Sequence, residues 1–431
     1  MTSGDYNALG QELIALRRDL HAHPETAWTE YRTTAVIASR LARAGIAVKY
    51  GAAIHSLREQ LPDAQTEASC LARAEKDGAD PAVLAELAGG YTGLAAEIEG
   101  EKPGPTVVLR VDIDALAVQE DASGDRAPVQ NGFASCYPGN MHACGHDAHA
   151  AIGVGAALIL QARRSELCGR VRILFQPSEE IMRGAVSFIG AGLLDDADYF
   201  YGGHVGLNLL ESGVVAAGCT GILASTKFNV RFVGQSAHSG ASPQLGRNAV
   251  AAAACATLNM LAIPRHGDGA SRVNVGTIRG GSARNVVPAE AEMCCETRGI
   301  TTEINAYMET SADRVCRAAA EMYGCTYERE IVMRAESAQS DPSLTPFITR
   351  VASAVPGIRR VEPTAYFGAC EDVSLMMRHV EARGGKAAEL MYGTPIAAPH
   401  HNGRFDIDES VVPTTARLLA ELALATAAER P

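Results

Sequence analysis

The nine residues from Met141 to His149, Met-His-Ala-Cys-Gly-His-Asp-Ala-His, concentrate side chains that bind metal ions or transfer protons. Three of the twelve histidines in the chain lie here, beside one cysteine and one aspartate. Neutral imidazole and thiolate are ligands for zinc and similar divalent metals. Gly145 separates Cys144 from His146 and allows a turn tight enough for both side chains to face one centre. Histidines gathered by chance on a surface loop are the alternative, but this density favours a metal site.

A second candidate is the carboxylate pair Glu179-Glu180, which follows an apolar run and Pro177. Neighbouring carboxylates repel each other, so one points away unless a cation lies between them. Such a pair often marks only the solvated start of a helix. Its position between other candidate ligands instead predicts that one carboxylate binds a metal while the other acts on the metal-bound water.

Three further histidines lie at the ends of glycine-rich or apolar segments. His204 follows two glycines, and His401 follows Pro399 and another histidine. Together with the first two segments they supply enough ligands for two metal ions that share one water. His238, flanked by glycines, is a candidate donor for polarising a carbonyl, although a plain surface histidine fits the local pattern equally well.

Short apolar runs predict buried strands that end at these candidates. The run 107–111 leads into Asp112-Ile-Asp114, the run 171–175 leads to the glutamate pair, and a third run, 199–205, places His204 at the end of a strand. A helix-forming stretch at 148–163 separates the first two runs. Ligands bind at the carboxyl ends of strands in an open α/β sheet. We therefore expect a di-metal catalytic α/β domain with a mixed central sheet.

From residue 224 the pattern changes to that of a second domain. The order strand, helix, strand, strand, helix, strand extends to residue 336, as in a ferredoxin-like α+β module. We expect residues 1–223 and 337–431 to form the catalytic domain in two parts, with 224–336 inserted as a lid and dimerisation domain. Residues 51–90 are polar, charged and helix-prone, which indicates a further insertion within the first part.

The composition argues against several classes of protein. The 431 residues carry a formal net charge of −12, which disfavours a nucleic-acid partner. Eleven cysteines, an odd number at irregular spacing, do not form a disulfide pattern. Residues 1–20 do not resemble a signal peptide, and apolar runs such as 148–160 fall short of a membrane span. These observations predict a cytoplasmic protein without a membrane partner.

The candidate segments lie in the order seen in one known family. They are 141–149, 176–180, 203–205, 234–238, 285–288, 371–372 and 401–406. In this order the chain resembles the co-catalytic metallo-amidohydrolases, the family of aminoacylase, hippurate hydrolase and the auxin-conjugate hydrolases. Within this family the chain resembles the subgroup that contains the A-type chain of aminobenzoyl-glutamate hydrolase and indole-acetyl-aspartate hydrolase. The segments that carry this resemblance are Phe133–Cys136, Ser271–Gly276 and the insertion at 51–90.

The resemblance implies a role for each candidate at the metal centre. Cys144 would bridge two divalent cations, Mn²⁺ or Zn²⁺ with Co²⁺ as a further choice, and Glu179 would be the general base. A metal-bound hydroxide would attack the amide carbonyl, while Asp114 would hold a ligand in orientation. The remaining metal ligands would be His146, Glu180, His204 and His401.

The resemblance also implies residues that bind substrate. His238 would stabilise the tetrahedral oxyanion in the active site of a partner subunit. Asn285 and Arg298 would hold the carboxylate of the amino acid, with Arg284 and Asn274 as weaker candidates.

The chain departs from the family in the segment Gly368-Ala-Cys-Glu-Asp372, where many relatives have Gly-Ser-Glu-Asp. Gly368 and its neighbours would touch substrate, so the departure leaves open which substrate side chain the enzyme prefers. Either His400 or His401 can be the last ligand, and the spacing His-x-x-x-Phe-Asp favours His401. Asn402, where many relatives have serine, also points to the aminobenzoyl-glutamate subgroup.

We therefore expect a metal-dependent amidohydrolase that cleaves N-acyl amino acids with an aryl or arylacyl group, such as aminobenzoyl-glutamate or indole-acetyl-aspartate. A homodimer is expected, and a paralogous B-type subunit is an alternative partner. Two other functions stay open: a dipeptidase or carboxypeptidase of the same family, and a catalytically silent metal-binding relative. A dipeptidase needs an acidic group for the substrate ammonium, and the sequence identifies none.

Overall fold

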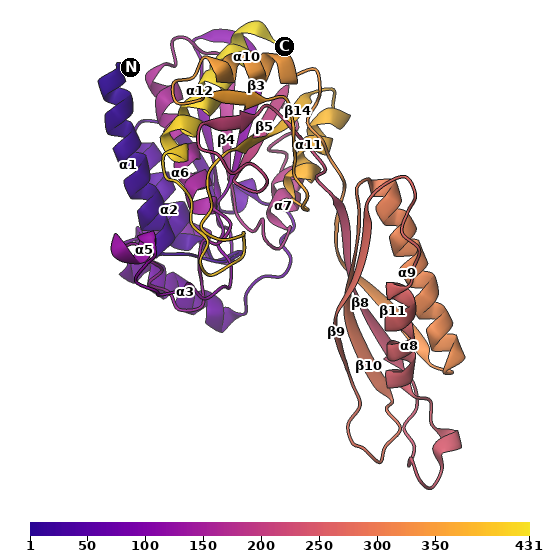
Figure 1. Cartoon of the computed structure of the whole chain (residues 1–431). Helices are drawn as coiled ribbons and strands as arrows, with labels where there is room; N and C mark the ends of the chain where they lie inside the picture. Colours follow the sequence, from indigo (N-terminus) through magenta and orange to yellow (C-terminus); the bar gives the residue numbers. More distant parts are fainter. The chain divides into compact units, whose positions relative to one another are not determined.

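The computed structural model describes residues 1–431 and divides them into two compact units (Figure 1). The first unit comprises Met1–Thr220, Gln339–Phe367 and Leu375–Pro431, and the second comprises Gly221–Ala338 and Gly368–Ser374. The main boundaries lie within three residues of the divisions at 224 and 336 expected from the sequence.

The short segment 368–374 differs from the sequence-based division, which assigns it to the catalytic domain. The Gly368 N–H donates to the Gly221 carbonyl at 3.1 Å, and the Leu223 N–H donates to the Ala369 carbonyl at 2.9 Å. These backbone hydrogen bonds attach the segment to the second unit.

A mixed sheet of eight strands forms the centre of the first unit, in the order β1-β2-β4-β3-β5-β14-β6-β12. The neighbouring strands β4, β3, β5 and β14 pair in parallel, whereas β2 joins β4 and β1 joins β2 in antiparallel pairing. This confirms the expected mixed sheet. The strands are β1 Ala47–Tyr50, β2 Leu94–Glu99, β3 Lys102–Asp112, β4 Cys168–Gln176, β5 Tyr199–Val205, β6 Val214–Ala216, β12 Arg360–Glu362 and β14 Lys386–Tyr392, with a separate pair of β7 Cys219–Thr220 and β13 Ala365–Tyr366.

Helices pack against this sheet through apolar side chains. The alanine, isoleucine and leucine residues of α6 share one core with β3, β4 and the C-terminal helix α12. At the N-terminus, α1 opens with a capping box in which Thr2 and Asp5 satisfy each other's backbone N–H groups. The helices outside the ferredoxin-like unit and the insertion are α1 Ser3–Ala22, α2 Tyr31–Arg43, α5 Ala127–Gln130, α6 His146–Ala162, α7 Gly184–Gly190, α10 Thr345–Ser353, α11 Val373–Ala382 and α12 Val411–Glu429.

Helix α12 is the one helix long and apolar enough to cross a membrane by length and composition, a feature that the apolar runs of the sequence do not single out. Of its apolar window, 67% is buried inside the structure. Leu418, Leu419 and Leu422 are all part of the main core of the first unit. The apolar character of α12 therefore serves the packing of this unit.

The insertion at 51–90 folds into η1 Gly51–Ile54, α3 Ala64–Lys76 and α4 Pro81–Leu87. Its helices bury a small core of their own against α2, which includes Ala74, Leu84 and Leu87. His55 lies among the rings of Trp28, Tyr91 and Phe188. Burial lowers the pKa of His55 to about 4, and its Nε2–H donates to the Thr92 carbonyl at 2.7 Å.

Acid should loosen the packing around His55. In the unfolded chain His55 binds a proton below its ordinary pKa of about 6.5, whereas in the folded protein it binds one only below about pH 4. The free energy of unfolding therefore falls as the pH is lowered from about 6.5 to about 4. The loss reaches at most about 3 kcal/mol at pH 4. We expect the urea midpoint to fall less between pH 7 and pH 4.5 in His55→Gln than in the wild type. Equal pH dependence in both proteins would contradict this assignment.

The second unit has the strand and helix order expected from the sequence. It consists of β8 Ala224–Val233, η2 Pro243–Leu245, α8 Ala249–Leu261, β9 Ser271–Gly280, β10 Glu290–Gly299, α9 Thr302–Met322 and β11 Thr326–Ala335. The antiparallel strands lie in the order β11-β8-β10-β9. Alternate residues such as Phe228, Val230 and Met293 share a core with α8 and α9, so the helices cover one face of the sheet. The ferredoxin-like arrangement is confirmed.

Parallel pairing in the first unit brings the candidate ligands to one edge of its sheet. Asp112 at the end of β3 pairs with Gln176 at the end of β4, and His204 in β5 pairs with Met391 in β14. The loops that follow β3 and β4 therefore leave the sheet side by side, as expected for a ligand site in an α/β fold.

Candidate metal centre

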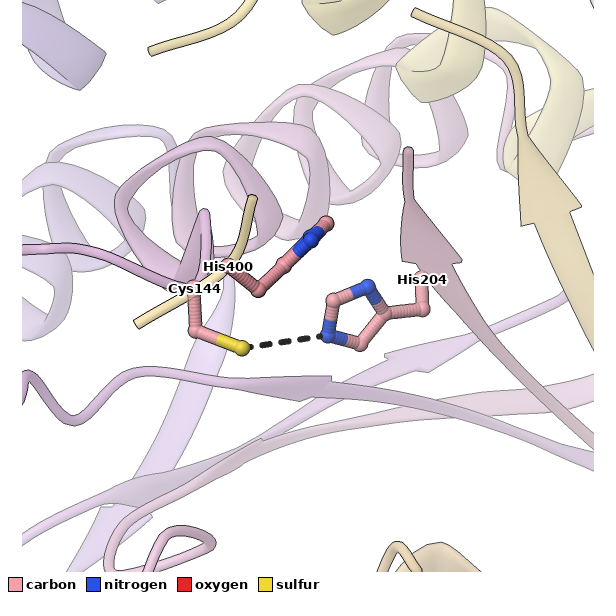
Figure 2. Close-up of side chains that lie close together, drawn as sticks. All are labelled: Cys144, His204 and His400. Carbon is pink, nitrogen blue, oxygen red and sulfur yellow. Dashed lines mark hydrogen bonds between the residues drawn. The ribbon is translucent and has the colours of Figure 1, made fainter. Parts of the chain in front are cut away.

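Cys144 and His204 face each other at the end of the sheet, with Sγ 3.5 Å from Nε2 (Figure 2). The Nδ1–H of His204 donates to the Val205 carbonyl at 2.9 Å. Because this hydrogen bond fixes the proton on Nδ1, the lone pair of Nε2 points toward the thiol. Both side chains are buried.

Gly145 makes the sharp turn between Cys144 and His146 and is the residue that precedes helix α6. Its φ of +91° lies in the left-handed region that favours glycine. A Cβ at this position would lie 2.5 Å from the Cγ2 atom of Val205. Both the backbone conformation and the space require glycine here.

His146 has a nitrogen that suits a cation. Its Nδ1–H donates to the Asp114 carbonyl at 2.9 Å, and its buried Nε2 has no hydrogen-bond partner. That Nε2 lies 3.9 Å from a Glu180 oxygen and 3.7 Å from an Asp112 oxygen. Burial lowers the pKa of His146, but the carboxylates outweigh it and raise the pKa to about 10. This pocket attracts positive charge.

The donor set matches divalent metal ions. Ligand atoms of Cys144, His146 and Glu180 lie within 4.8 Å of one another, and so do those of Cys144, His204 and His400. Cys144 belongs to both groups, as a bridging thiolate would. Thiolate, imidazole and carboxylate together are typical ligands of zinc and similar metals. The residues therefore fit two metal ions.

Asp114 positions both the glutamate pair and His146. Its carboxylate accepts the backbone N–H groups of Glu179 and Glu180, each at 3.0 Å, while its carbonyl accepts from His146. Ser178, just before the pair, has a φ of +57°, which is unfavourable for a residue other than glycine. The turn is thus held in a specific shape with Glu179 buried next to Glu180.

Replacing Asp114 with asparagine should impair this turn. An asparagine amide offers one acceptor oxygen, so one of the two N–H groups loses its partner and Glu179 shifts. We expect kcat/KM or metal affinity to fall roughly 10- to 100-fold in Asp114→Asn. Kinetics and elemental analysis would measure it. Asp198→Asn is the matched control, because Asp198 accepts the Thr106 N–H at the opposite end of β3; an equal loss there would argue against a specific role for Asp114.

His149 belongs to the sequence motif, but the sequence predicts no role for it. Its Nδ1–H donates to Asp112 at 2.6 Å, and its Nε2 accepts the Val205 N–H at 3.0 Å. Both ring nitrogens are thereby used, so His149 supports the end of β5 rather than binding metal. The spacing of three residues from His146, which places both on one face of α6, is the signal that could have indicated it.

The structure brings both His400 and His401 to the centre. The Nε2–H of His400 donates to the Val205 carbonyl at 3.2 Å, and its ring lies 5.3 Å from the His204 ring. His401 Nε2 lies 3.5 Å from a Glu180 oxygen, and its side chain is half exposed. The backbone of His401 has a φ of +64°, a strained conformation stabilised by donation to the Ala143 carbonyl at 2.8 Å. Both side chains therefore reach the centre: His400 groups with Cys144 and His204, whereas His401 contacts Glu180.

The other predicted residues lie in the second unit, and two of them are neighbours. The Ser239 N–H donates to the Asn285 carbonyl at 3.1 Å, and His238 forms a bridge with Val286. His238 Nδ1 accepts the N–H groups of Gly240 and Ala241, at 3.1 and 3.0 Å. Its proton therefore lies on Nε2, which leaves an exposed donor of the kind expected for polarising a carbonyl. Arg284 is in the same exposed loop as Asn285.

Arg298 lies at the opposite end of β10 from this loop. Its guanidinium contacts Glu296 at 3.1 Å, and Asn274 on β9 pairs with Glu296 in the sheet. The eight steps from Glu290 to Arg298 span roughly 26 Å at about 3.3 Å per residue. Asn285 and Arg298 of one chain are therefore too far apart to hold the same carboxylate, so a carboxylate held by both would need residues of two chains.

These features define an α/β unit with a centre of cysteine, histidine and glutamate side chains at one edge of its sheet. Residues 108–425 match peptidase family M20/M25/M40, and the chain belongs to this family. It is 41% identical to indole-3-acetyl-aspartic acid hydrolase of Enterobacter agglomerans, over 96% of this chain and 95% of the relative. It is also 41% identical to the A-type chain of p-aminobenzoyl-glutamate hydrolase of Escherichia coli K12, over 97% and 96% of the two chains.

Solved structures agree with this assignment. The aminobenzoyl-glutamate utilization protein of Klebsiella pneumoniae has a TM-score of 0.81 at 36% identity, covering 98% of each chain. The YXEP protein of Bacillus subtilis, described as a dinuclear metal binding peptidase, has a TM-score of 0.74 at 26% identity over 98% and 99% of the chains. The expected family and fold are confirmed, and the chain is a hydrolase of amide C–N bonds.

Proposed function

We propose that the protein hydrolyses the amide bond between an aromatic acyl group and a dicarboxylic amino acid, as in aminobenzoyl-glutamate or indole-acetyl-aspartate. The observation that carries the proposal is the grouping of Cys144, His146 and Glu180 ligand atoms within 4.8 Å beside buried Glu179. The names of the two 41% identical relatives support this substrate class.

The ligand set is Cys144, His146, Glu180, His204 and His401, with Mn²⁺ or Zn²⁺ as the proposed metals and Co²⁺ as a substitute. When bound, two such cations would lower the pKa of a water and polarise the substrate carbonyl.

The side chains around the ligands divide the proton transfer and the positioning between them. Glu179 takes the proton of the attacking water and passes it to the leaving amine. Asp114 holds Glu179 in place through the backbone N–H groups of the turn. The Nε2–H of His238 donates to the carbonyl oxygen as negative charge develops there.

We propose that two copies of the chain associate through the second unit and that each supplies His238 and Asn285 to the site of the other. Strand β9 is an edge of its sheet and carries exposed Ile278, while α8 exposes Leu258 and Leu261. An uncovered edge strand beside apolar side chains favours pairing with a second copy. A B-type subunit is the alternative partner.

We also propose a cytoplasmic location. None of the eleven cysteines forms a disulfide, which supports this location.

A substrate panel tests the proposal. Protein stripped with a chelator is reloaded with Mn²⁺, Zn²⁺ or Co²⁺ and assayed on aminobenzoyl-glutamate, indole-acetyl-aspartate, hippurate, acetyl amino acids and free dipeptides. We expect the two acyl dicarboxylates to give the highest kcat/KM. Preference for free dipeptides would identify a dipeptidase instead, and hydrolysis of nothing by the metal-loaded protein would indicate a silent relative. Activity that appears only when a B-type subunit is added would show that the active assembly is a hetero-oligomer and not the homodimer.

A further inference from the structure

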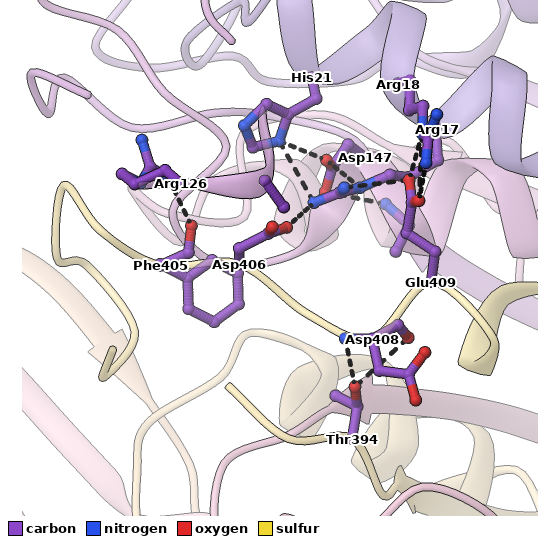
Figure 3. Close-up of polar contacts among 12 residues, drawn as sticks. Arg17, Arg18, His21, Arg126, Asp147, Thr394, Phe405, Asp406, Asp408 and Glu409 are labelled. Carbon is purple, nitrogen blue, oxygen red and sulfur yellow. Dashed lines mark hydrogen bonds and ion pairs between the residues drawn. The ribbon is translucent and has the colours of Figure 1, made fainter. Parts of the chain in front are cut away.

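A buried ionic network joins the N-terminal helix to the segments that carry metal ligands (Figure 3). Arg17 of α1 is fully buried, with its Nε atom 2.9 Å from Asp147 and a terminal nitrogen 2.8 Å from Asp406. Its other terminal nitrogen lies 3.3 Å from Glu409. One guanidinium thus contacts three carboxylates from two distant parts of the chain.

The two inner carboxylates stand next to the metal centre in the sequence. Asp147 directly follows His146 at the start of α6, and Asp406 lies in the loop that contains His401. No single helix or strand connects these segments. Arg17 is therefore placed to fix the distance between two of the ligands that the proposed centre needs.

A second arginine strengthens the same connection. Arg126 donates to Glu120 at 2.8 Å and to the Phe405 carbonyl at 3.2 Å. His21 completes the link, because its ring contacts Asp147 at 2.7 Å and Glu120 at 3.3 Å. The Phe405 ring in turn lies 4.6 Å from the His400 ring.

Cations of this network stabilise the charge of buried Asp147. Burial raises the pKa of Asp147, but Arg17 and His21 outweigh it and lower the pKa far below its usual range. Buried ion pairs cost about as much in desolvation as they return, so apolar side chains would hold these segments together equally well. What the guanidinium adds is direction, since its planar fork of N–H groups donates to carboxylates only in set orientations.

We propose that Arg17 is a positioning residue of the metal centre, which sets the spacing between His146 and His401 through Asp147 and Asp406. The proposal rests on the ligand set assigned under the proposed function. It predicts that loss of the fork weakens metal binding even where the protein folds, by roughly 10- to 100-fold, the range found for groups that orient metal ligands.

The test uses the full chain, stripped of metal and titrated with Co²⁺ while the absorption spectrum is recorded. Arg17→Lys keeps the charge but loses the fork, and Asp406→Asn removes one carboxylate while leaving Arg17 two others. Arg18→Gln is the matched control, because Arg18 is the next residue on α1 and pairs with Glu409 at 2.5 Å but is not part of the contacts to Asp147 or Asp406. Melting curves of the metal-free proteins separate weak binding from misfolding.

We expect both Arg17→Lys and Asp406→Asn to bind Co²⁺ more weakly and with an altered spectrum, lowering kcat more than they change KM, while Arg18→Gln matches the wild type. If Arg17→Lys fails to fold, Asp406→Asn decides the question alone. Folded variants with wild-type Co²⁺ affinity and spectrum would overturn the proposal. A wild-type protein that binds no Co²⁺ would instead overturn the proposed function.

Discussion

Glu179→Gln should lose nearly all turnover and keep its metal. The amide of glutamine can neither accept the proton of the attacking water nor return it to the leaving amine, so kcat falls by roughly 10²- to 10⁴-fold. The turn itself survives, because Asp114 holds it through the backbone N–H groups of Glu179 and Glu180 and not through the Glu179 side chain. Steady-state kinetics on aminobenzoyl-glutamate and elemental analysis of the same sample provide the two measurements.

Glu180→Gln is the comparison for this variant. Because Glu180 contacts His146 and His401, its replacement should reduce bound metal as well as activity. The two neighbouring carboxylates therefore separate proton transfer from metal binding. Full activity in Glu179→Gln, or loss of its metal, would contradict the role of general base.

Two inactive variants should restore each other's activity when combined in one dimer. Strand β10 separates Arg298 from the loop of Asn285, which lies beside His238, by roughly 26 Å, so one chain cannot present Asn285 and Arg298 to one substrate carboxylate. If His238 acts in the partner's site, a dimer of one Glu179→Gln chain and one His238→Ala chain contains one site with both groups intact. We expect such a dimer to show about half of the wild-type activity, since one of its two symmetric sites is complete.

Differently tagged chains, co-expressed and purified through both tags, provide the mixed dimer. Each variant purified alone is the control and should remain inactive. A mixed dimer as inactive as its parents would show that His238 works only within its own chain. Failure of the two tagged chains to purify together would reject the homodimer.

The sequence predicts most of the fold because apolar runs and periodicity are local properties. The third apolar run predicts β5 at its observed bounds, 199–205, and the ferredoxin-like order is complete. Segment 368–374 falls on the wrong side of the expected division because its attachment depends on two backbone hydrogen bonds to residues far earlier in the chain. The sequence does not show whether α12 packs inside the protein, because a buried core helix and a membrane-spanning helix have the same length and composition. Only the structure shows its residues in the core of the first unit.

The centre shows a similar limit. Cys144, His146 and the glutamate pair are identifiable from residue type and spacing. The roles of Asp112 and His149 are visible only in the structure, where Nδ1 of His149 donates to Asp112 and Nε2 accepts the Val205 N–H. Arg17 carries no local signal, since an arginine on an amphipathic N-terminal helix usually faces solvent. Its burial depends on carboxylates 130 and more positions away in the sequence.

Gly145 limits how this protein can vary over evolution. The residue combines a left-handed backbone with a wall, formed by Val205, only 2.5 Å from where a Cβ would stand. A change to alanine would need both a new backbone path between two ligands and a smaller side chain at the end of β5. A single substitution at position 145 is therefore unfavourable, and a change there must be accompanied by a change at Val205.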